Sequence, residues 1–112
     1  MKKVLIYAMR GDKMCFAHAL LNALDLDEAG HTARIVFEGQ AVTLPKQLAD
    51  EGNPLYQKAL DKGLIAGVCR ACAKQLGALE DVQALGLPLL QDMSGHAGMR
   101  PFVEQGYDIV VM

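Results

Sequence analysis

The sequence has no tryptophan, few aromatic residues and no strong excess of either charge. Aromatic residues occupy 5% of its 112 positions, and 13 acidic against 11 basic residues leave a formal charge of −2. Proteins that bind nucleic acid usually carry a basic surface, so this balance predicts no nucleic-acid partner. No apolar run approaches the roughly 18–20 residues that span a membrane. The 52% of hydrophobic residues exclude a disordered chain and predict one globular domain, residues 1–112.

Several catalytic and cofactor motifs are also absent. The sequence contains no GxGxxG segment for a dinucleotide, no GxxxxGK[ST] phosphate loop and no serine nucleophile elbow. We therefore expect no nucleotide cofactor. A structural zinc site usually needs four Cys or His ligands in paired knuckles, and this chain has one CxxC. The sequence thus predicts no structural metal, and a soft metal held by Cys69, Cys72 and His96 stays open as an alternative.

The cysteines and the N-terminal segment indicate the cellular compartment. Cys15, Cys69 and Cys72 are an odd number of thiols and too few for a disulfide scaffold. The apolar run 4–9 follows a basic start, as in a signal peptide, but it is short and charged residues follow at once. We interpret this run as a buried strand and expect a cytoplasmic protein.

Five short apolar runs alternate with helical patterns along the chain. The runs cover 4–9, 33–38, 64–68, 87–90 and 107–112, and helices are predicted over 14–27, 44–61, 70–85 and 96–105, with breaks near Pro54 and Gly77. Nearly continuous apolar runs are typical of parallel strands covered on both faces. The pattern predicts an α/β fold, a three-layer α/β/α sandwich with an open five-stranded parallel sheet. The strand orders 2-1-3-4-5 and 4-3-2-1-5 both fit.

The cysteines fall where the predicted strands end, which is where open α/β sheets gather their reactive groups. Cys69 ends the third run and precedes a helix, so the helix N-terminus and Arg70 favour its thiolate form. We predict that Cys69 is a nucleophile or a persulfide carrier. Cys72 lies three residues on, either as a resolving thiol or packed under the helix, whereas Cys15 is predicted to pack in the first turn of its helix.

One of the three histidines is placed to act with Cys69. His96 follows the fourth run, and both strand orders put the third and fourth strands side by side. We therefore expect its ring within about 10 Å of the Cys69 sulfur, about two strand spacings. There it could take a proton from a thiol or stabilise the thiolate. His18, in mid-helix, is predicted to be a surface or core residue, and His31 a turn residue.

Four segments resemble the DsrE/DsrF-like (DsrEFH) sulfur-relay family. They are KKVLIYAMRGD, GVCRACAKQLG, MSGH and YDIVVM, which together extend over essentially the whole chain. The resemblance implies an α/β/α domain and an intracellular sulfur relay, in which the cysteine that matches Cys69 carries sulfane sulfur as a persulfide. It also implies homo- or hetero-oligomers, commonly trimers and hexamers, with sulfur donor and acceptor proteins as partners.

The combined prediction is a sulfur carrier with Cys69, Cys72 and His96 at its site. Whether such a protein turns over as a sulfurtransferase is left open by the sequence. Two other functions are compatible with the same residues. One is a small-molecule or metal-binding module without catalysis, and the other is a structural subunit of an oligomeric sulfur-metabolism complex.

Overall fold

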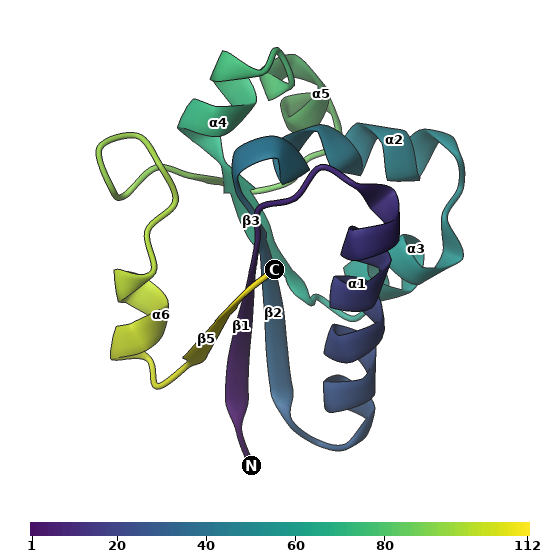
Figure 1. Ribbon diagram of the computed structural model, residues 1–112, viewed down its shortest axis with the longest axis vertical. Coiled ribbons are helices and arrows are strands. Elements are labelled where there is room, and N and C mark those ends of the chain that lie inside the picture. The colour runs from purple at the N-terminus through teal and green to yellow at the C-terminus, as the bar shows by residue number, and fades with distance from the viewer.

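The computed structural model describes residues 1–112 and contains five strands, six α-helices and one 3₁₀ helix (Figure 1). In chain order these elements are β1 (Lys3–Ala8), α1 (Lys13–Glu28), β2 (Thr32–Phe37), η1 (Gly39–Thr43), α2 (Leu44–Asp50), α3 (Pro54–Asp61), β3 (Ile65–Cys69), α4 (Arg70–Gln75), α5 (Leu79–Ala84), β4 (Leu89–Leu90), α6 (Arg100–Glu104) and β5 (Asp108–Val111). None of the helices combines the length and the apolar character that crossing a membrane requires.

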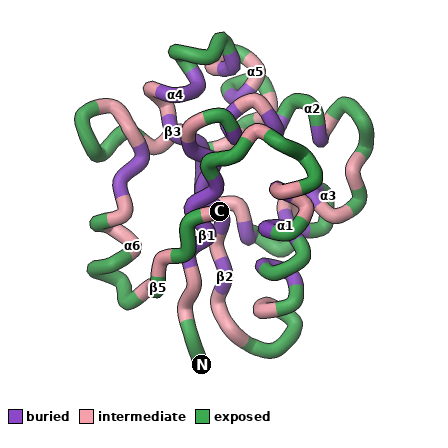
Figure 2. Tube along the Cα trace, viewed as in Figure 1, coloured by how far each residue is buried: buried purple, intermediate pink, exposed green.

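The five strands form one parallel sheet in the order β4-β3-β2-β1-β5. This is the second of the two orders compatible with the sequence, and it places β2 between β1 and β3. Leu5, Val36 and Val68 on the three central strands are fully buried. Figure 2 shows the buried residues concentrated in these strands. The predicted α/β fold with an open five-stranded parallel sheet is therefore confirmed.

Helices cover both faces of the sheet, as the continuous apolar runs predict. α1 packs on β1 and β2 and also contacts α3, whereas α6 packs against β5 on the opposite side (Figure 1). Phe16 of α1 stacks on Phe37 of β2 with ring centroids 4.9 Å apart. On the other side, Phe102 of α6 meets Tyr107 edge to face at 5.6 Å. The second face is the thinner layer, because α6 has only five residues.

The predicted helix breaks are present, and each has a local cause. Asn53 precedes α3, where its side chain accepts a hydrogen bond from the Tyr56 N–H at 3.1 Å, and Pro54 is the first helical residue. Gly77 separates α4 from α5 with a φ of +72°, a conformation that favours glycine. The helical pattern over 44–61 and 70–85 thus becomes two pairs of short helices.

The predicted helix over 96–105 is wrong in its first half, because α6 begins only at Arg100. A helix from residue 96 would place Pro101 in its interior, where the ring would clash with the carbonyl of Ala97. Residues 91–99 instead form a loop with turns at Ser94 (φ 50°) and Gly95 (φ 89°). His96 therefore lies in a loop that crosses the edge of the sheet.

Candidate functional site

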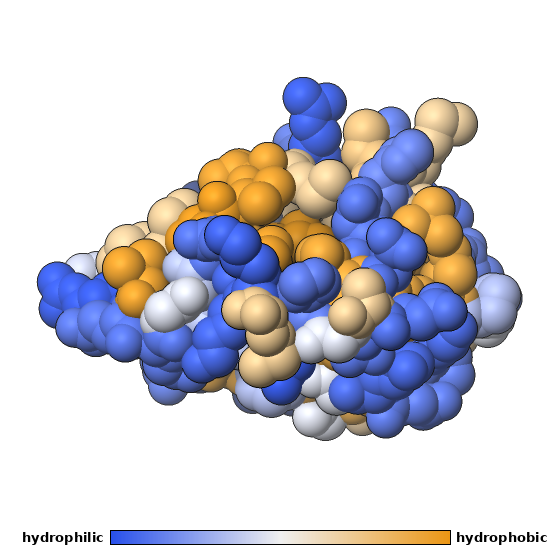
Figure 3. Space-filling model, turned by 90° about the horizontal axis from the view of Figure 1, so that it is seen from below, coloured by the Kyte–Doolittle hydropathy of each residue, from blue (hydrophilic) through white to orange (hydrophobic).

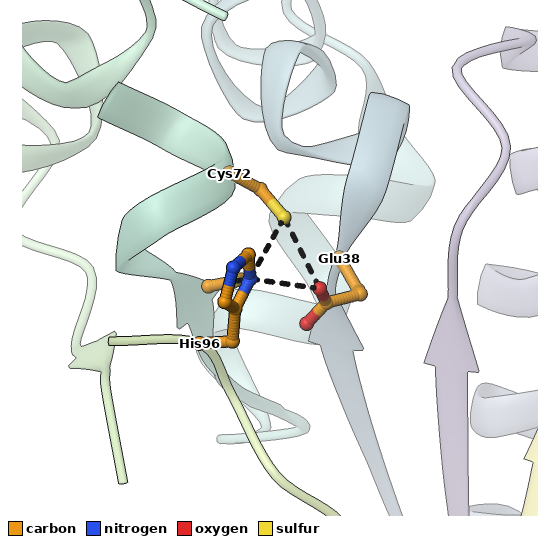
Figure 4. A group of neighbouring side chains, drawn as sticks. Glu38, Cys72 and His96 are labelled. Atoms are coloured by element: carbon orange, nitrogen blue, oxygen red, sulfur yellow. Dashed lines mark hydrogen bonds and ion pairs between the residues drawn. The ribbon is translucent and has the colours of Figure 1, made fainter. Parts of the chain in front are cut away.

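Three segments of the chain meet at the carboxyl ends of β2 and β3. Glu38 follows β2 directly, Cys69 is the last residue of β3, and Cys72 lies in the first turn of α4. The loop from β4 to α6 adds His96. One donor atom from each of these four residues lies within 4.8 Å of the others. Figure 4 shows Glu38, Cys72 and His96 pointing toward one another, and these four residues, the Glu38 cluster, are the group that could hold a metal ion.

Cys69 is fully buried, and a loop amide rather than its own helix contacts its sulfur. The Ala97 N–H donates a hydrogen bond to Cys69 Sγ at 3.3 Å. The Cys69 side chain makes no hydrogen bond to α4, and the Ala71 N–H of that helix donates to the Gly95 carbonyl at 3.0 Å. Arg70 takes part in none of the ion pairs. The backbone hydrogen bond to the Cys69 sulfur therefore comes from the loop after β4 and not from the amides of α4.

His96 contacts both sulfurs of the cluster. Its Nδ1 lies 3.4 Å from Cys69 Sγ and 3.5 Å from Cys72 Sγ, so the predicted proximity of His96 and Cys69 is confirmed. The backbone of His96 is fixed, because Met93 and His96 exchange two N–H to carbonyl hydrogen bonds of 2.9 Å. The His96 side chain is 40% exposed. The imidazole thus connects the buried sulfurs to solvent.

Cys72 is buried and donates its thiol proton to a carboxylate. Its Sγ lies 3.1 Å from Glu38 Oε1. Burial raises the pKa of the Cys72 thiol well above its usual range, and the hydrogen bond to Glu38 and the negative charge of that carboxylate raise it further. Cys72 therefore remains a neutral thiol at physiological pH, in contrast to a nucleophilic thiolate.

Glu38 was not predicted as a site residue, although it is the last residue of the second apolar run. It is only 6% exposed, and it is the one charged residue among those buried in the core. Its Oε1 accepts from Cys72 and lies 3.8 Å from His96 Nδ1, whereas its Oε2 is buried with no hydrogen-bond partner. A buried carboxylate without full pairing is costly, so its presence here indicates a functional constraint.

Tyr7 on β1 is a further residue that the sequence did not single out. Its hydroxyl donates to the Ala97 carbonyl at 2.8 Å, and the N–H of the same Ala97 donates to Cys69 Sγ. Burial raises the pKa of Tyr7 above its usual range, and the nearby charge of Glu38 adds to this effect. The protonated hydroxyl therefore positions the peptide group that contacts the sulfur.

Three other candidates lie outside the cluster. Cys15 is half-buried in the first turn of α1 and packs beside Phe16, as predicted, on the far side of β2 from Cys69. His18 lies on the exposed side of α1. His31 precedes β2 at the opposite end of the sheet, where its Nδ1 accepts from the Lys2 N–H at 2.9 Å.

A cleft of about 620 Å³ opens beside the cluster. Tyr7 and residues of the loop that carries His96 line it, among them Met93 and the oppositely charged Asp92 and Arg100. The cleft shares Tyr7 and this loop with the site, but none of the four residues of the Glu38 cluster lines it.

Two uncharacterized archaeal proteins are similar to this chain. It is 34% identical over 96 residues to the uncharacterized protein MJ0733 of Methanocaldococcus jannaschii, a match that covers 83% of this chain and 76% of that protein. The chain belongs to the same family. An uncharacterized protein of Archaeoglobus fulgidus is 37% identical over 49 residues, which cover 44% of this chain and 80% of that one. No family model matches the sequence, and no solved structure matches it.

Proposed function

We propose that the protein is a cytoplasmic sulfur carrier that holds sulfane sulfur as a persulfide on Cys69. The 3.4 Å contact between His96 Nδ1 and Cys69 Sγ carries this proposal, because an activated thiol needs a base within reach of its proton. The resemblance of four segments to the DsrE/DsrF-like family supports the same function. The archaeal relatives, being uncharacterized, neither add to it nor oppose it.

Loading would proceed by transfer of one sulfur atom from a donor persulfide, R–S–SH. His96 takes the proton of the Cys69 thiol, and the resulting thiolate attacks the outer sulfur of the donor. A new S–S bond forms on Cys69 while the donor's S–S bond breaks, which leaves Cys69–S–SH and the donor thiolate R–S⁻. An acceptor thiolate then attacks the outer sulfur in the same way and releases the Cys69 thiolate.

Two neighbours would stabilise the anionic forms of the carrier. The Ala97 N–H already donates to the Cys69 sulfur, and a protonated His96 would place a positive charge against it. Glu38 Oε1 lies 3.8 Å from the same Nδ1. The site thus places a proton acceptor, His96, between the Cys69 sulfur and the buried carboxylate of Glu38.

Cys72 would protect the persulfide rather than consume it. An ionised Cys72 could attack the sulfur of Cys69, form a disulfide and expel hydrosulfide. The raised pKa of Cys72, caused by burial and by Glu38, keeps it protonated and therefore slow in this reaction. Cys72 would therefore act as a resolving thiol only under conditions that ionise it.

The test is the intact mass of metal-free, reduced protein after incubation with a small-molecule persulfide donor. Wild type should gain one sulfur atom that a reducing agent removes, and Cys69→Ser should not. Cys15→Ser is the matched control, because Cys15 also lies at a strand-to-helix junction but outside the cluster. Equal loading of wild type and Cys69→Ser, or loss of loading in Cys15→Ser, would contradict the proposal and favour a binding module or structural subunit.

We also propose a homo-oligomer, a trimer or hexamer, that exchanges sulfur with donor and acceptor proteins. β5 is an edge strand, and Val110 and Val111 on it are about half exposed, as is Val103 of α6. Figure 3 shows apolar side chains gathered on one face of the molecule between hydrophilic ones. Sedimentation at micromolar concentration should show species larger than the 12.1 kDa chain. A single monomeric species would contradict this proposal.

A further inference from the structure

The geometry points to a binding site for a thiophilic divalent cation, formed by Glu38, Cys69, Cys72 and His96. This inference does not depend on the sulfur-carrier proposal. The cluster offers two sulfurs, one imidazole nitrogen and one carboxylate oxygen. Thiolate, imidazole and carboxylate are the ligands that Zn²⁺ takes in tetrahedral protein sites.

Four distances between the donor atoms are close to those of a tetrahedron around one ion. Bonds of about 2.3 Å to sulfur and about 2.0 Å to nitrogen and oxygen require donor atoms about 3.3–3.8 Å apart. His96 Nδ1 lies 3.4 Å and 3.5 Å from the sulfurs of Cys69 and Cys72. Glu38 Oε1 lies 3.1 Å from Cys72 Sγ and 3.8 Å from His96 Nδ1. All four donor atoms lie within 4.8 Å of one another, so a cation would need to draw the most distant pair together by up to about 1 Å.

The state of Glu38 is an independent indication of a ligand. Its carboxylate is 6% exposed, and its Oε2 has no hydrogen-bond partner although it is buried. No lysine or arginine pairs with it. Apart from the His96 ring at 3.8 Å, no basic side chain faces this buried carboxylate, and a divalent cation would supply positive charge next to it and the two thiols. On binding, the two thiols release their protons to solvent and the sulfurs coordinate as thiolates.

The surroundings of the cluster hold the ligands in place. The Ala97 N–H donates to Cys69 Sγ, and the Tyr7 hydroxyl fixes the same Ala97 through its carbonyl. Such contacts behind the ligands orient them and strengthen metal binding. The single CxxC of the sequence thus supplies only one pair of ligands, and the chain completes the set from β2 and from the loop after β4.

The site can be tested by titrating metal-free, reduced protein with Co²⁺, because the absorption spectrum of bound Co²⁺ depends on its ligands. We expect one Co²⁺ per chain, with the intense visible bands of a tetrahedral site and a thiolate-to-cobalt charge-transfer band that Zn²⁺ abolishes. Glu38→Gln should weaken binding at least about 10-fold, and Cys69→Ser should reduce the charge-transfer band. The control variants Glu51→Gln and Cys15→Ser, which lie outside the cluster, should leave the Co²⁺ affinity and the charge-transfer band unchanged.

Weak bands of an octahedral ion, or a tetrahedral spectrum that survives both Glu38→Gln and Cys69→Ser, would overturn the site. Circular dichroism of each metal-free variant checks its fold, and His96→Gln provides a second ligand variant that removes no charge. The sulfur-carrier test uses metal-free protein and a mass readout, so either proposal can fail while the other holds.

Discussion

Two strand-to-helix junctions of this protein carry a cysteine, and only one of them forms a site. At the β1–α1 junction, the Asp12 carboxylate accepts hydrogen bonds from the N–H groups of Met14 and Cys15 at 2.7 Å and 3.2 Å. The Cys15 sulfur has no polar partner there. At the β3–α4 junction, Cys69 itself occupies the N-cap position, and a loop distant in sequence crosses over it.

The difference between the junctions lies in this crossing loop rather than in the helix start. The loop from β4 to α6 places one backbone N–H and one imidazole against Cys69. The buried part of this loop, residues 97–98, is visible as a short buried stretch before α6 in Figure 2. A cysteine at the start of a helix is therefore insufficient, and the second segment that covers it determines its chemistry.

The largest effect should come from removing the imidazole next to Cys69, with a histidine of exposed α1 as the control. His96→Ala should slow persulfide loading of Cys69 about 100-fold, because general base catalysis contributes at least this much. His18→Ala, on exposed α1, should leave the rate unchanged. The measurement is the rate of mass gain of metal-free protein. Equal rates for the two variants would remove His96 from the mechanism.

A smaller effect should follow from displacing the crossing loop. In Gly98→Ala the new Cβ would lie 2.5 Å from Asp92 Oδ2, so that carboxylate, which accepts from the Gly98 N–H, must swing away, and 3.1 Å from Met93 Cβ, so the loop must give by a few tenths of an ångström. We expect a loss of about 1–3 kcal/mol in the free energy of unfolding, together with slower alkylation of Cys69.

Gly11→Ala is the control at the β1–α1 junction. Its Cβ would meet Gln40 Cβ at 3.1 Å and the Gln40 carbonyl oxygen at 3.2 Å, and no atom of the crossing loop is among these contacts. This variant is also expected to lose stability but to keep the alkylation rate of Cys69. Urea unfolding and alkylation kinetics give the two quantities, and a slower rate in both variants would argue against a specific role of the loop.

Tyr7→Phe tests the contact between β1 and the crossing loop. The variant leaves the Ala97 carbonyl without its 2.8 Å hydrogen bond, which should cost about 1 kcal/mol of unfolding free energy. The tetrahedral Co²⁺ spectrum should persist with weaker binding, because Tyr7 holds the loop but is not a ligand. Unchanged stability and unchanged Co²⁺ binding would show that this hydrogen bond does not position the loop.

The subtlest effect should appear in the pH dependence of Cys72. Burial and Glu38 raise its pKa, so its alkylation in a variant that lacks the other two cysteines should require alkaline pH. Glu38→Gln removes the negative charge and should move the alkylation profile toward lower pH. The same raised pKa implies a folded state that loses stability as pH rises above the ordinary range of the thiol. A profile that Glu38→Gln leaves in place would contradict this account.

Much of the fold could be predicted from local patterns. Continuous apolar runs marked the strands, and Pro54 and Gly77 marked helix breaks, because each restricts or frees the backbone where it stands. The helix predicted to begin at residue 96 was wrong. The prediction followed the helical pattern of residues and neglected Pro101, whose ring is incompatible with a helical turn before it. The strand order remained a choice between two, since it depends on packing between elements.

The functional site, like the fold, could be predicted only in part from the sequence. The sequence by itself determined that Cys69 and Cys72 lie together, through their spacing of three residues on one helix start, and that His96 follows a neighbouring strand. Only the tertiary structure decided that Glu38 and Tyr7 join them and that Cys15 does not. Glu38 lies 34 residues from Cys72, and Tyr7 lies 90 residues from the Ala97 that it contacts. Contacts of this kind depend on which strands pair in the sheet, and no local pattern of residues encodes that pairing.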